Sequence, residues 1–211
     1  YVGRLSFHAK ANPFPMYKAL ENVANRSTQK IVLIECGFYA NESIKDAFTE
    51  AFQNLSPNIR IIRVDGTNNE LRLKAFAAAH IFCSLSDNIQ ETFGITPIEA
   101  MASGLPVVVS DWDGYKESVR HDIDGFCVPT FMAPSGYGFD LARRYAFQID
   151  NYDEYIGYTS NFISVDIELT TEAFLKLISN KKLREEMGSN AKKRAIENFD
   201  WKKIILRYHE L

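Results

Sequence analysis

Short apolar runs alternate with longer amphipathic segments from residue 1 to residue 128, and this alternation limits the fold more than any other feature of the chain. The apolar runs have the length and the β-branched content of buried strands, and breakers or polar residues flank them. Most are separated by amphipathic segments long enough to cross, as a helix, from one parallel strand to the next. The sequence therefore predicts an α/β fold in which helices cover both faces of a parallel sheet.

The expected strands cover 1–5, 30–36, 58–64, 80–84, 106–110 and 125–128. Helices are expected between them over 13–25, 43–54, 69–79 and 93–103, and further helices over 171–179, 181–198 and from 201 to the end. Ligands of such folds bind beyond the carboxyl ends of the strands. The loops that follow residues 5, 64 and 84 should therefore meet at one rim of the sheet.

The composition is that of an ordinary globular domain, with 46% hydrophobic and 24% charged residues. A length of 211 residues suits one large domain or two small ones. The net charge of -3 argues against a broad nucleic-acid-binding surface. No apolar run reaches the roughly 18 residues of a membrane-spanning helix, and no signal peptide is evident.

Three cysteines, Cys36, Cys83 and Cys127, each lie within or at the end of an apolar run that is expected to form a strand. Their spacing matches no metal-binding or redox motif, so we interpret them as reduced core residues. Reduced thiols are typical of the cytosol, and we therefore predict a cytoplasmic protein.

The segment from 84 to 111 holds the most informative polar residues. Glu91 lies just before the expected helix 93–103, and Glu99 lies inside it as the only charged residue between Thr92 and Ser110. A carboxylate among apolar neighbours needs polar partners, because its desolvation is costly. The alternative is that Glu99 lies on a solvated face of the helix.

An anion site is expected where this helix begins. Gly94 has no side chain to hold a ligand away, and the free amides of residues 93–96, those of Phe93 and Ile95 among them, point beyond the helix N-terminus. Side chains lean toward the N-terminus of their helix, so Glu99 leans toward the same place. An anion on these amides, with a carboxylate on either side to accept hydroxyl hydrogen bonds, indicates a sugar-phosphate group.

Residues 91–99 read ETFGITPIE, and residues 99–106 read EAMASGLP. These residues resemble the EX7E region of retaining glycosyltransferases of family four. The matching features are the two glutamates with seven residues between them, the Phe-Gly pair after the first glutamate and the tail after the second. This resemblance implies the GT-B fold, in which two Rossmann-like domains face a cleft. It further implies that the chain is the C-terminal, donor-binding half of such an enzyme.

The resemblance also assigns roles to residues. It implies that Glu99 holds the ribose hydroxyls of a nucleoside diphosphate sugar and that Glu91 meets the donor sugar. In the family, a Gly-Arg pair and a lysine six residues later bind the donor diphosphate, and Arg4 and Lys10 reproduce this spacing. Charge supports the assignment, because a diphosphate needs cations and the guanidinium fork matches its oxygens.

Some features leave alternatives open. Arg4 could instead form a structural salt bridge, and Lys10 could be a solvated loop lysine. The family usually has glycine after this lysine, whereas Ala11 and Asn12 follow here, so the path of the loop is expected to differ.

Two further loops, 36–38 after the second strand and 65–68 after the third, are expected at the rim. Gly66 and Thr67 resemble, more loosely, a family loop that meets the nucleobase, although a plain turn is an equal alternative. Asp87, Asn88 and Gln90 make the loop before Glu91 unusually polar. We expect one or more of these three to touch the sugar hydroxyls, unless the loop is simply solvated.

Residues from about 129 to 165 replace a much shorter connection in the family and carry nine aromatic side chains. Of two interpretations, we favour an extra helical layer packed on the domain. The other is a contact with an absent domain or with a second subunit.

We therefore predict one nucleotide-sugar-binding domain over residues 1–211, with Glu91, Arg4 and Lys10 as catalytic residues. The chain begins at Tyr1 in a strand and ends at Leu211 in a helical pattern, so we expect a fragment whose N-terminal acceptor domain is absent. The isolated fragment should then be unable to transfer sugar. Peripheral membrane association through the absent domain remains open.

The predicted donor is a nucleoside diphosphate sugar, with UDP-sugar weakly favoured, and the resemblance implies neither a metal nor another cofactor. Alternatives are a nucleotide-sugar epimerase or a sugar phosphorylase of the same fold, and a nucleotide-binding domain without turnover. A dinucleotide oxidoreductase is disfavoured, because no Gly-x-Gly-x-x-Gly follows the first strand.

Overall fold

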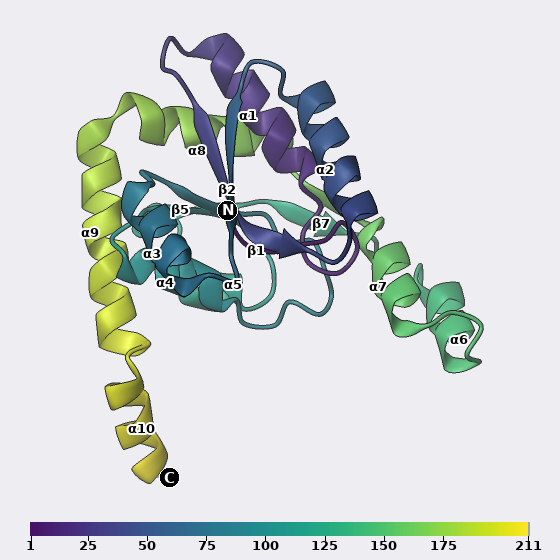
Figure 1. The fold of residues 1–211 in the computed structure, drawn as a ribbon. Helices are drawn as coiled ribbons and strands as arrows, with labels where there is room; N and C mark the ends of the chain where they lie inside the picture. The colour runs from purple at the N-terminus through teal and green to yellow at the C-terminus, as the bar shows by residue number, and fades with distance from the viewer. Residues whose placement is uncertain (211) are drawn as a thin grey trace.

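The computed structural model describes residues 1–210 and contains two three-stranded parallel sheets with helices around them (Figure 1). The first sheet has the order β1-β2-β3, and the second has the order β4-β5-β6. Their bounds are β1 (Val2–Leu5), β2 (Val32–Tyr39), β3 (Arg60–Asp65), β4 (Phe82–Ser84), β5 (Val107–Ser110) and β6 (Gly125–Val128). Each predicted strand is present, and the predicted α/β class is confirmed.

Helices connect these strands and follow them. They are α1 (Phe14–Arg26), α2 (Glu42–Leu55), α3 (Asn69–Ala78), α4 (Ile95–Ala102), the short α5 (Tyr115–Ser118), α8 (Ile167–Ser179), α9 (Lys181–Asn198) and α10 (Trp201–His209). Asn41, Asn68 and Asn180 begin α2, α3 and α9, each accepting a backbone N–H of the first turn. Within residues 1–210, no helix combines the length and apolar character that crossing a bilayer requires.

Two hydrophobic clusters hold the sheets between the helices, and each cluster contains strands of both sheets. In one cluster, α1, α2 and α8 pack with Leu5 and Val108. In the other, α3, α4 and α9 pack with Val2, Phe82 and Val107. Neighbouring strand residues point to opposite faces, so Val107 and Val108 enter different clusters. Helices therefore cover both faces, as predicted.

Strand β2 extends beyond the predicted range 30–36, because its pairing with β1 continues until Leu5 lies opposite Tyr39. The prediction ended where Gly37 interrupts the apolar run. A Cβ at Gly37 would lie 2.1 Å from the carbonyl oxygen of Gly3, which no side chain allows. This glycine marks the close approach of two strands and not the end of one.

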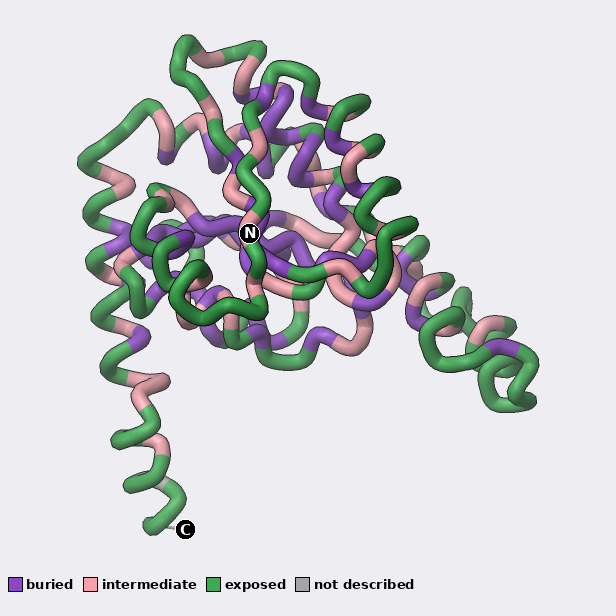
Figure 2. Tube along the Cα trace, in the orientation of Figure 1, coloured by how far each residue is buried: buried purple, intermediate pink, exposed green. Residues whose placement is uncertain are grey.

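The segment 129–165 forms a helical hairpin on a two-stranded base, and the favoured interpretation of a layer packed on the domain is wrong. β7 (Thr130–Met132) pairs antiparallel with β8 (Ile163–Val165), and α6 (Phe139–Ala146) and α7 (Tyr152–Ser160) lie between them. The hairpin projects from the body (Figure 1), and it is mostly exposed (Figure 2). The Tyr145 ring stacks on that of Tyr155, so these aromatic residues pack within the hairpin.

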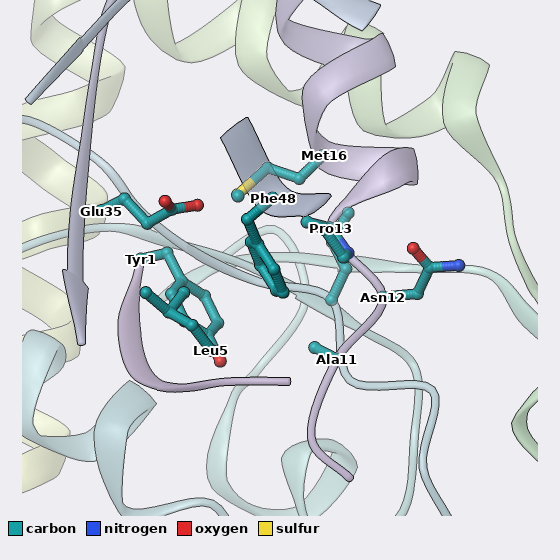
Figure 3. A pocket seen from close by; sticks show the side chains of 9 residues that line it. Tyr1, Leu5, Ala11, Asn12, Pro13, Met16, Glu35 and Phe48 are labelled. Atoms are coloured by element: carbon teal, nitrogen blue, oxygen red, sulfur yellow. The ribbon is translucent and has the colours of Figure 1, made fainter. Parts of the chain in front are cut away.

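A charged network lies inside the first sheet. Glu35 of β2 has a fully buried carboxylate that accepts hydrogen bonds from the hydroxyls of Tyr17 and Tyr39, and Arg63 Nε lies 3.2 Å from Glu35 Oε2. Burial and the charge of Glu35 raise the pKa of both tyrosines, which keeps their hydroxyls protonated as donors. Figure 3 shows Glu35 at a small pocket whose lining includes apolar side chains such as Phe48. Of the three side chains bonded to the carboxylate, Arg63 is the one with a positive charge, and it balances the negative charge of the buried group.

Replacing Arg63 with methionine is expected to lower the free energy of unfolding by about 1–3 kcal/mol, because the buried carboxylate loses a charged hydrogen-bond partner. Arg60→Met, at an exposed position of the same strand, is the matched control. Urea denaturation followed by circular dichroism measures both. Equal, small losses in the two variants would show that the Arg63–Glu35 pair adds no net stability.

Candidate functional site

Lys10 and Glu91 form an ion pair at the rim of the sheets, although 81 positions separate them in the sequence. Lys10 lies in the loop after β1, and Glu91 lies in the loop after β4, so the carboxyl ends of the parallel strands bring them together. Glu91 is only 7% exposed. The Tyr115 hydroxyl lies 3.5 Å from Glu91 Oε2 and 2.9 Å from Ser84 Oγ, which places a second polar group beside the carboxylate.

Arg4 holds the loop that carries Lys10. Its Nη2 donates to the carbonyl oxygen of Ala9 at 2.9 Å, one residue before Lys10. Its interaction is therefore with the backbone, and the salt bridge considered as an alternative is not what the structure contains. Arg4 is exposed, and a guanidinium has five N–H donors, so further donors remain for a ligand.

The helix α4 begins at Ile95, two residues later than predicted, and Gly94 makes that beginning possible. The φ angle of Gly94 is 76°, in the left-handed region. A Cβ at this position would also lie 2.0 Å from Cε1 of Tyr115, so both conformation and space require glycine. Phe93 and Ile95 point their side chains to solvent, while the first amides of α4 have no carbonyl partner from a preceding turn.

Glu99 lies on α4 and pairs with Arg72 of α3, whose Nη1 is 3.1 Å from Glu99 Oε1. Its other oxygen, Oε2, is buried without a hydrogen-bond partner within the described residues. The alternative of a freely solvated carboxylate is therefore wrong. Arg72 is not among the predicted site residues, although its position in the helix that follows the β3 loop was a usable signal, because that loop belongs to the same rim.

Gly66 and Thr67 form a tight turn after β3. The N–H and the hydroxyl of Thr67 both donate to Asp65 Oδ1, at 2.9 and 2.7 Å, and these bonds hold the pKa of Asp65 below its usual value. Gly66 N donates to the carbonyl of Gly37 at 2.9 Å, which ties the turn to β2. The structure thus contains the turn that we named as an alternative, and contact of this turn with a nucleobase stays a prediction.

The polar side chains of segment 86–90 bind the backbone of segment 8–12, an arrangement that neither sequence-based expectation describes. Asp87 Oδ1 accepts the N–H of Asn12 at 3.2 Å, and the side-chain amides of Asn88 and Gln90 donate to the carbonyls of His8 and Ala9. Asp87 and Asn88 are buried. They are therefore neither solvated nor directed at a free space for sugar hydroxyls.

Comparison with known proteins identifies relatives of the chain. Residues 1–135 match the family model described as Glycosyl transferases group 1. The chain is 27% identical over 128 residues to the uncharacterized glycosyltransferase MJ1607 of Methanocaldococcus jannaschii, in an alignment that covers 61% of this chain and 30% of that protein.

Two solved structures show the same fold. HepE of Anabaena, in complex with UDP, has a TM-score of 0.63 and 20% identity, over 99% of this chain and 47% of HepE. The C-terminal domain of LpcC, a glycosyl transferase group 1 family protein from Francisella tularensis, has a TM-score of 0.58 and 16% identity, over 94% of this chain and 84% of that domain. The predicted C-terminal half of a GT-B fold is thereby confirmed. The chain spans half or less of MJ1607 and HepE.

Asp87 should make stability depend on pH. Burial raises its pKa from 3.8 to about 7, so between these values the unfolded chain loses a proton that the folded chain keeps. The free energy of unfolding that depends on Asp87 is therefore highest below about pH 4, and it falls as pH rises to about 7. Thermal or urea unfolding should show that this fall in the free energy of unfolding is about 2–4 kcal/mol smaller in Asp87→Asn than in wild type. The control Asp46→Asn, on the exposed face of α2, should show the same fall as wild type. Equal pH profiles of wild type and Asp87→Asn would contradict the expectation.

Proposed function

Because this chain belongs to the glycosyl transferases group 1 family, we propose that it forms the donor-binding domain of a retaining glycosyltransferase. The observation that carries the proposal is the Lys10–Glu91 pair beside the beginning of α4. It places a cation, a carboxylate and free helix amides together, and a nucleoside diphosphate sugar offers phosphates and hydroxyls to match them. The UDP bound to HepE supports UDP as the nucleotide, and a HepE complex with UDP-glucose supports a hexosyl donor.

In this proposal, charge stabilisation of the leaving diphosphate supplies most of the catalysis. Arg4, Lys10 and the first amides of α4 neutralise the negative charge that develops as the bond from the sugar C1 to the phosphate oxygen breaks. The acceptor oxygen bonds to C1 on the same face, and its proton passes to the leaving phosphate. Glu91 positions the donor sugar, and no metal is needed in this scheme.

Glu99 would hold the ribose hydroxyls. Arg72 holds Oε1, and Oε2 is buried without a partner within the described residues, so a ribose hydroxyl would reach Oε2 only after the carboxylate turns. Gly66 and Thr67 are the proposed contacts to the base. The acceptor side of the cleft would come from an N-terminal domain, in line with relatives that are about twice as long or longer. We therefore expect this chain to bind donor without robust transfer.

Lys10→Ala is expected to weaken UDP binding by about 1–3 kcal/mol, because a charge-assisted contact to phosphate is lost. Isothermal titration calorimetry with UDP and no added divalent metal measures this. Lys18→Ala, at an exposed position of α1, removes the same charge away from the site and should leave the affinity unchanged. Unchanged affinity in Lys10→Ala would remove Lys10 from the site.

The two glutamates should respond differently to neutral substitution. Glu99→Gln should weaken both UDP and UDP-glucose, because the nucleoside is common to both. Glu91→Gln should not weaken UDP, since Lys10 is then released from its ion pair, but it should lose the added affinity that the glucose of UDP-glucose brings. Calorimetry with each ligand on each variant separates the roles. Equal effects on both ligands in both variants would contradict this division.

A further inference from the structure

Four neighbouring side chains after β4 bind successive backbone groups of the loop after β1. The amide of Asn88 donates to the carbonyl of His8, and the amide of Gln90 donates to that of Ala9. In addition, Ser86 Oγ lies 3.4 Å from the carbonyl oxygen of Lys10, and Asp87 accepts the N–H of Asn12. We call this set of contacts, between 86–90 and 8–12, the loop clamp.

The clamp takes the place of secondary structure for the loop 8–12. This loop has no helix or strand of its own and follows β1 directly. Without the clamp, the carbonyl of Ala9 would keep only its bond from Arg4, and that of His8 would need water or another partner. Side chains that bond several successive peptide groups restrict the backbone, and a restricted loop loses less conformational freedom when a ligand binds.

The segment that carries the clamp is itself hydrogen-bonded to β5, to Trp112 and within itself. Trp112 Nε1 donates to the carbonyl oxygen of Asn88 at 3.0 Å, and Asn88 Oδ1 accepts the N–H of Gln90 at 3.0 Å. Ser110 Oγ donates to the carbonyl oxygen of Ser86 at 2.6 Å. The backbone of the clamp residues Ser86 and Asn88 is therefore fixed by Ser110 of β5 and by Trp112 after it, as a preorganised site requires.

Glu91 follows directly after Gln90, so the same segment supplies both the clamp and the carboxylate that pairs with Lys10. We propose that Asn88 and Gln90 are positioning residues that act through Lys10, fixing its ammonium beside Glu91 where a diphosphate binds. This inference rests on the proposed donor site. It assigns to these two amides a role in nucleotide affinity that requires no contact with the ligand.

The clamp can be tested first without any ligand. Gln90→Met keeps the side-chain length and removes the N–H donor, and Asn88→Ala removes the other amide. Gln53→Met, at an exposed position of α2, is the matched control. Hydrogen exchange followed by mass spectrometry should become faster in peptides covering 8–12 in the two clamp variants only. Unchanged exchange there in both, with wild-type thermal stability, would overturn the clamp.

The role in affinity is tested by UDP titration in a double-mutant cycle with Lys10→Ala. Gln90→Met should weaken UDP binding about three- to tenfold, the range for losing one hydrogen bond. In the Lys10→Ala background the same change should have no further effect, because the residue through which it acts is gone. Since Gln90 is only partly buried, Gln90→Met keeps the test usable if Asn88→Ala fails to fold.

The outcomes separate this inference from the proposed function. A loss of UDP affinity that persists in the Lys10→Ala background would overturn the positioning role and leave the donor site standing. Wild-type chain that binds neither UDP nor UDP-glucose would overturn the proposed function and the positioning role together, while the exchange experiment would still decide whether the clamp holds the loop.

Discussion

The rim of this protein depends on hydrogen bonds from side chains of one loop to the backbone of another. The loop after β1 carries Lys10, and the loop after β4 carries Glu91, but neither loop has regular secondary structure at these residues. The amides of Asn88 and Gln90 bind the first loop directly. Because buried backbone groups must find partners, these contacts hold the backbone from which the Lys10 side chain reaches Glu91.

The fold below the rim supplies the rigidity that this arrangement needs. Parallel strands place the two loops at one edge, and helices on both faces bury the apolar residues of both sheets. Within this interior, Glu35 is held by two tyrosine hydroxyls and by Arg63. Nearer the site, the ring of Tyr115 closely approaches Gly94 and its hydroxyl faces Glu91.

The candidate site was partly predictable. Lys10 and Glu91 were expected at the same rim, because each follows a parallel strand, and the structure joins them in an ion pair. Arg72 was missed, because its place in the helix after the β3 loop points to the rim but does not show that it lies beside Glu99. The role of Asn88 was also missed, because a polar loop residue has the same appearance in sequence whether it faces a ligand, water or backbone.

For residues 1–128 the sequence by itself determined the order and direction of the strands and main helices, because apolar periodicity and breakers act locally along the chain. It also determined that Glu91 lies before α4 and Glu99 within it, whereas Gly94, expected inside a helix over 93–103, lies just before the helix. Only the tertiary structure decided that the aromatic hairpin of α6 and α7 projects from the domain, and which partner each polar side chain of 86–90 takes. The polar contacts of 86–90 join segments about eighty residues apart, and no local pattern encodes the distance or direction of a partner that lies so far along the chain.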